Sequence, residues 1–126
     1  MPPDNLKMFD AAVLDHFERP RNAGELENPT ASVEVTNPVC GDVLHLTVRV
    51  QDGRVSEVKF KTRGCVTSIA ASSALTELIR GKSRAEISAI TPEEISAALG
   101  GLPPATFHGA QLAADAAAAL VPKLPR

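Results

Sequence analysis

The chain has 126 residues, 44% hydrophobic and only 3% aromatic, which suits one domain with a core packed largely by small residues. Its formal net charge of −2 argues against binding nucleic acid or an acidic membrane surface. The sequence shows neither the apolar core of a signal peptide nor a stretch as long as a membrane span. We therefore expect a cytoplasmic protein with a single domain over residues 1–126.

The first part of the chain predicts one helix and three strands. Apolar residues at helical spacing predict a helix over 6–18, which Pro20 ends. Alternating apolar residues then predict strands over 31–36, 43–50 and 54–62. Asp52 and Gly53 form a strong hairpin signal between the last two strands. Three consecutive strands with short connections predict an antiparallel meander.

Helices follow the third strand. Helical periodicity begins at Thr67, with Thr67 or Ser68 as the expected N-cap and Gly81 as the stop. Residues 100–109 form a loop rich in helix breakers, and the other predicted helical segments are 83–88, 91–99 and 110–121. This order predicts an α+β fold in which helices pack on one face of a three-stranded antiparallel meander.

Both cysteines of the chain lie at boundaries between elements. Cys40, in NPVCGDVLHLTV, comes just before the second strand, and Cys65 lies between the third strand and the next helix. Cytosolic thiols are usually reduced, so the two residues indicate metal or sulfur chemistry, or else are small buried hydrophobic residues.

Two further donors lie at element ends. Asp42 is two residues from Cys40, so an extended backbone points both side chains to one side. His108 lies between the proline-containing loop and the last helix. Two thiolates, an imidazole and a carboxylate suit Zn²⁺, and they can also hold an iron–sulfur cluster. A turn role for Asp42 and a surface position for His108 remain alternatives.

The other two histidines receive no role. The helical pattern places His16 on the polar, exposed side of the first helix. The alternation of the second strand places His45 on its solvent-facing side.

Four stretches carry a family resemblance: LDHFERPRNAG (14–24), NPVCGDVLHLTV (37–48), FKTRGC with SIAASSALTELIRGKS (60–83) and LPPATFHGAQLAADAA (102–117). Matching stretches occur in the same order, and with few gaps, in the iron–sulfur cluster assembly scaffolds of the IscU and NifU N-terminal-domain type. The chain therefore resembles that family. The resemblance implies a non-enzymatic scaffold that holds a labile cluster of the [2Fe–2S] type, or zinc when no cluster is present. The implied partners are a cysteine desulfurase and apo-protein cluster acceptors.

The resemblance also assigns ligands. Cys40 and Cys65 match two of the three cysteines of the family, and Asp42 matches an aspartate whose weak binding lets a cluster be released. His108 matches the histidine that precedes the third cysteine, but the third cysteine itself is replaced by Gly109. We expect position 109 to lie at an exposed helix end, where a cysteine would fit at little cost to the fold.

A second departure lies in LPPAT, where Ala105 and Thr106 replace the valine–lysine that usually ends the chaperone-binding segment of the family. This difference argues against recognition by a dedicated Hsp70-type chaperone.

Two other functions stay open. One is a zinc-bound sulfur-transfer partner of a desulfurase, similar to SufU proteins. Those proteins usually carry an insertion before the third cysteine, and this chain has neither the insertion nor that cysteine. The other is a degenerate zinc-binding regulator of a desulfurase, which the missing cysteine favours and the retained ligand motifs disfavour.

Overall fold

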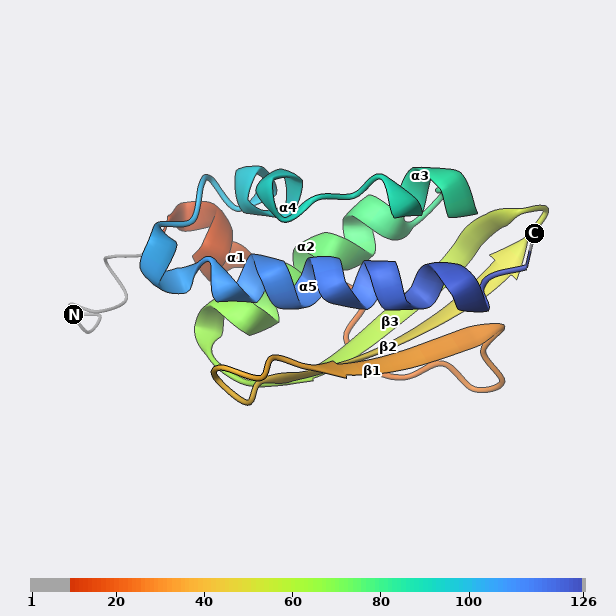
Figure 1. Ribbon diagram of the computed structural model, residues 1–126, viewed down its shortest axis with the longest axis horizontal. Coiled ribbons are helices and arrows are strands. Elements are labelled where there is room, and N and C mark those ends of the chain that lie inside the picture. Colours follow the sequence, from red (N-terminus) through yellow and green to blue (C-terminus); the bar gives the residue numbers. More distant parts are fainter. Residues whose placement is uncertain (1–9, 126) are drawn as a thin grey trace.

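The computed structural model describes residues 10–125 of the chain. The described part forms an α+β fold, with the sheet on one side and the helices on the other (Figure 1). Its strands and α-helices are α1 (Ala11–Glu18), β1 (Ala31–Thr36), β2 (Val43–Gln51), β3 (Arg54–Arg63), α2 (Val66–Ile79), α3 (Arg84–Ser88), α4 (Pro92–Ala98) and α5 (His108–Leu120). Short 3₁₀ turns lie at η2 (Pro104–Thr106) and η3 (Val121–Lys123).

The sheet is the predicted antiparallel meander in the order β1-β2-β3. One row across it pairs Val33 with Leu46 and Leu46 with Phe60, so the apolar residues of all three strands share a face. The hairpin between β2 and β3 has positive φ at both Asp52 (54°) and Gly53 (76°), as a two-residue hairpin turn requires. The predicted fold class is confirmed.

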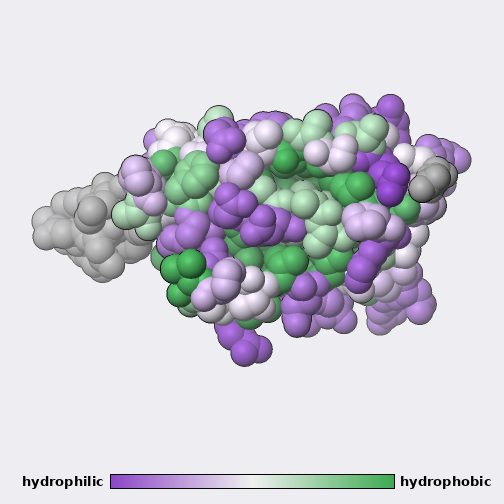
Figure 2. All heavy atoms as spheres, in the orientation of Figure 1, coloured by the Kyte–Doolittle hydropathy of each residue, from purple (hydrophilic) through white to green (hydrophobic). Residues whose placement is uncertain are grey.

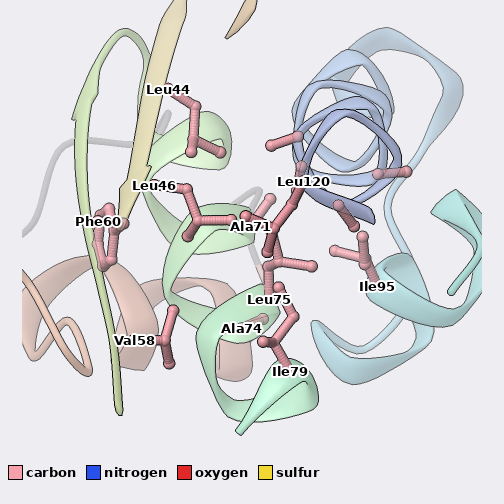
Figure 3. Packing of buried hydrophobic residues seen from close by; sticks show 14 of the residues in the cluster. Leu44, Leu46, Val58, Phe60, Ala71, Ala74, Leu75, Ile79, Ile95 and Leu120 are labelled. Carbon is pink, nitrogen blue, oxygen red and sulfur yellow. The ribbon is translucent and has the colours of Figure 1, made fainter. Parts of the chain in front are cut away.

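Helix α2 lies at the centre of the core. Leu46 of β2 reaches toward Ala71 and Leu75 of α2 and toward Leu120 of α5, while Ile95 of α4 lies beyond those helices (Figure 3). All five side chains are fully buried. Since the sheet and other helices surround α2, it has almost no polar outer face, and its alanines and serines allow close packing.

Helix α5 runs along the sheet and contributes the middle of the face shown in Figure 2. Hydrophobic side chains form patches across that middle, and hydrophilic side chains lie among them and along the upper and lower rims. Within residues 10–125, every helix is too short or too polar to cross a membrane.

The starts of three helices differ from prediction. Helix α1 begins at Ala11, because the Asp10 side chain accepts a hydrogen bond from the Ala12 backbone N–H; residues 6–9 of the predicted helix lie outside the described residues. Helix α2 has Cys65 as its N-cap, so the prediction of Thr67 or Ser68 was wrong. Helix α5 starts at His108, two residues before the predicted start.

The prediction that His16 is exposed was also wrong. His16 is buried, and its Nδ1 lies 2.8 Å from Ser73 Oγ of α2. Ser73 Oγ also accepts a hydrogen bond from the Arg21 backbone N–H, which leaves its hydroxyl hydrogen for His16 Nδ1. His16 Nε2 lies 3.4 Å from Glu77 Oε1. His16 therefore packs against the polar residues Ser73 and Glu77 of α2 instead of facing solvent.

Candidate metal centre

A closed turn in residues 37–42 presents Cys40 and Asp42 ahead of β2. The buried Asn37 side-chain oxygen accepts hydrogen bonds from the backbone N–H groups of Val39 (2.8 Å) and Cys40 (3.3 Å). The Asn37 backbone N–H donates to Asp42 O, and the Gly41 N–H donates to Asn37 O, both at 2.8 Å. Asn37 therefore holds the turn, a role that sequence reasoning missed although asparagine at a turn start is its signal.

Cys65 is the N-cap of α2, and its sulfur lies beside the first turn of that helix. Cys65 Sγ is 3.2 Å from Thr67 Oγ1 and 3.4 Å from Ser68 Oγ. Burial by itself would raise the pKa of the Cys65 thiol. Hydrogen bonding of the sulfur with Ser68, through its side chain and its backbone N–H, and with Thr67 outweighs burial. With a smaller contribution from His108, it holds this pKa below its ordinary value. Thr67 and Ser68, predicted as helix caps, contact the sulfur instead.

Asp42 joins the turn to the start of α2. Its Oδ2 accepts hydrogen bonds from Ser68 Oγ (2.5 Å) and from the Cys65 backbone N–H (3.3 Å). Gly64 makes room for this carboxylate, because a Cβ at position 64 would lie 2.5 Å from Asp42 Cγ. Burial acts to raise the pKa of Asp42, but the hydrogen bonds from Ser68 and Cys65 lower it, so the carboxylate is ionised.

His108 completes the cluster as the first residue of α5. Its Nε2 lies 3.4 Å from Cys65 Sγ. Cys40, Asp42 and His108 each offer one ligand atom, and these three atoms lie within 4.8 Å of one another. Cys65 is outside this group of three but contacts two of its members, Asp42 and His108. The structure thus gathers all four predicted donors where β2, α2 and α5 begin.

This position suits a site for a metal-containing cargo. Both cysteines are exposed, and Asp42 and His108 are half-buried, so the cluster is open to solvent and to other proteins. The N-termini of α2 and α5 both point toward it, and their partial positive charge stabilises thiolate and carboxylate. Two thiolates, one imidazole and one carboxylate are a donor set that fits zinc or iron.

The expectation that Gly109 lies at an exposed helix end was wrong. Gly109 is buried against the first turn of α2. A Cβ at this position would lie 2.9 Å from Thr67 C and O and 3.1 Å from Ser68 N. Because these are backbone atoms, they cannot rotate away. A cysteine at position 109 therefore requires one helix to move.

His45 lies where the alternation of β2 placed it, on the sheet face away from the helices. It is half-buried, and its Nε2 lies 3.6 Å from Glu25 Oε1. It is not a member of the donor cluster in the described part of the chain.

Comparisons with known proteins agree with this architecture. The protein-family model for the NifU-like N-terminal domain matches residues 8–126 of this chain. The chain is 44% identical over 109 residues to the iron–sulfur cluster assembly scaffold protein IscU 1 of Archaeoglobus fulgidus, covering 86% of this chain and 71% of the relative. It is 42% identical over 117 residues to the scaffold protein IscU of Haemophilus influenzae, covering 90% and 92% of the two chains.

A solved structure shows the same fold. The N-terminal part of a nitrogen-fixing NifU-like protein from Brucella abortus superposes with a TM-score of 0.73 at 19% identity, covering 90% of this chain and 92% of that one. The resemblance identified from the sequence motifs is thereby confirmed. With a matching family model over almost all of its residues, the chain belongs to the NifU-like N-terminal domain family.

Proposed function

We propose that this protein, as a single domain over residues 1–126, is a scaffold on which a labile iron–sulfur cluster is assembled and from which it is passed on. The observation that carries the proposal is the convergence of Cys40, Asp42, Cys65 and His108 at one exposed point of the fold. The protein binds and transfers cargo in this proposal, so it is not an enzyme.

The donor set explains why the cargo is labile. Thiolates and imidazole hold iron firmly, whereas a carboxylate is a harder and weaker ligand for it. Asp42 Oδ2 is already engaged by Ser68 and by the Cys65 N–H, so a metal competes with these hydrogen bonds for the carboxylate. A [2Fe–2S] cluster is the proposed cargo, and zinc occupies the same donors when no cluster is present.

The sulfur donor in this proposal is the persulfide of a cysteine desulfurase. A thiolate of the scaffold attacks the terminal sulfur, a new S–S bond forms, and the donor cysteine leaves as its thiolate. Cys40 is accessible for this step, since it is exposed beside Val39, which is 92% exposed. Apo-proteins then receive the cluster in the cytoplasm. The prediction that Ala105 and Thr106 weaken recognition by an Hsp70-type chaperone stays a prediction.

The ligand number favours one alternative. Four donors satisfy a tetrahedral zinc ion with no open position, and position 109 has no thiol to accept sulfur. In this alternative the protein is a zinc-binding regulator of a cysteine desulfurase. Zinc-bound sulfur transfer is the other alternative, and the missing thiol at position 109 counts against it.

Anaerobic reconstitution with iron and sulfide separates these functions. A scaffold gives the visible absorption of an iron–sulfur cluster, which Cys40→Ser and Cys65→Ser abolish and His108→Ala reduces. His45→Ala is the matched control, because this histidine lies outside the cluster, and it should behave like the wild type. A wild-type protein that binds one zinc per chain and forms no cluster would refute the scaffold. Persulfide labelling after incubation with a desulfurase then separates sulfur transfer from regulation.

A further inference from the structure

Helices α5 and α2 lie in close contact where α5 begins. At Gly109 a Cβ would lie 2.9 Å from two backbone atoms of Thr67, closer than side-chain carbons approach in folded proteins. The next residue of α5, Ala110, is fully buried, as is Ala70 of α2. The absence of a side chain at position 109 is therefore a condition for the observed separation of the two helices.

This separation also sets the geometry of the donors. His108 precedes Gly109 in α5, and Cys65 caps the turn of α2 that contains Thr67. A displacement of α5 from this turn would carry His108 away from Cys65, whose Sγ lies 3.4 Å from His108 Nε2.

We propose that Gly109 is a positioning residue of the metal centre: its missing side chain lets α5 start against the first turn of α2 and so places His108 beside Cys65. This inference rests on the proposed metal centre and adds a role for a residue that binds nothing itself. It also implies that the ligand set of this chain is complete with Cys40, Asp42, Cys65 and His108.

The first test is the stability of metal-free Gly109→Ala in urea. In a helix without a steric conflict, replacing glycine by alanine raises the unfolding midpoint, because alanine has the higher helix propensity. The close contact predicts the opposite, a lower midpoint than that of the wild type. A midpoint equal to or above that of the wild type would overturn the proposal.

The second test is the affinity for Co²⁺, followed by its thiolate charge-transfer absorption, with folding checked by circular dichroism. We expect Gly109→Ala to weaken Co²⁺ binding by about 10-fold or more, the usual effect of disturbing the support of a ligand. In a His108→Ala background, the same substitution should have little further effect. Ala118→Gly is the control for a purely structural loss, because Ala118 is exposed on α5, and it should lower the urea midpoint without changing Co²⁺ affinity. Equal weakening in both backgrounds would show that Gly109 does not act through His108.

A measurement on the wild type keeps the proposal testable if Gly109→Ala does not fold. In the Zn²⁺-bound protein, ¹⁵N NMR should show His108 bound through Nε2, the atom that faces Cys65. Coordination through Nδ1, or no coordination by His108, would overturn the proposal. A wild type that binds Co²⁺ but forms no cluster refutes the scaffold function and leaves the role of Gly109 intact.

Discussion

The hydrogen bond between Ser68 and Asp42 offers a direct test of how the loop before β2 is attached to α2. Ser68 is completely buried, and its hydroxyl donates to Asp42 Oδ2 at 2.5 Å. Replacing Ser68 by alanine removes this donor and leaves almost no cavity. The carboxylate then keeps its bond from the Cys65 N–H.

The size of the effect follows from the charge and exposure of Asp42. A hydrogen bond to a charged group contributes about 1.5–3 kcal/mol to stability. Asp42 is half-buried, so water partly replaces the lost donor, and we expect Ser68→Ala to lower the free energy of unfolding by about 1.5 kcal/mol. In a double-mutant cycle with Asp42→Ala, the coupling between the two residues should be about 1 kcal/mol.

The assay is urea unfolding of the two single variants, the double variant and the wild type at pH 7, without metal. Ser72→Ala is the matched control, since Ser72 is also buried in α2 but its hydroxyl donates to Ser68 O. It should show no coupling with Asp42→Ala. Additive effects of Ser68→Ala and Asp42→Ala would refute the attachment of the loop through this hydrogen bond.

Three further predictions concern the donors and the buried histidine. Asp42→Ala should make a reconstituted cluster longer-lived, because a hard ligand is lost; a faster decay of its visible absorption than in the wild type would contradict this. Gly64→Ala should weaken Co²⁺ binding and destabilise the fold by about 1–3 kcal/mol, because its Cβ would collide with Asp42, and unchanged Co²⁺ affinity would show that the carboxylate adapts. Burial lowers the pKa of His16, with Arg21 adding to this effect and Glu77 opposing it. As the pH falls below about 6.5, His16 therefore takes up a proton in the unfolded chain before it does so in the folded protein. The free energy of unfolding of the wild type should therefore fall as the pH decreases. Its slope against pH should exceed that of His16→Asn by up to about 1.4 kcal/mol per pH unit, and equal slopes would refute this assignment.

The sequence by itself determined the elements whose signals are local. The alternation of apolar residues in β2 and the Asp52-Gly53 turn specify a hairpin, because side-chain direction and turn geometry depend on neighbouring residues. Thr91 caps α4 and a proline follows it, which is a start signal carried by neighbouring residues. The motifs around Cys40 and Cys65 led to the family, which the comparisons confirm.

The tertiary structure decided what depends on residues far apart in the chain. Cys65 became the cap of α2 because Asp42, 23 residues earlier, accepts its N–H. His16 was buried because Ser73, 57 residues later, offers it a hydrogen bond. Gly109 was buried because α5 crosses the first turn of α2 there. A helical or alternating pattern shows which side of an element is polar, but only packing determines whether that polar side meets water or another part of the chain.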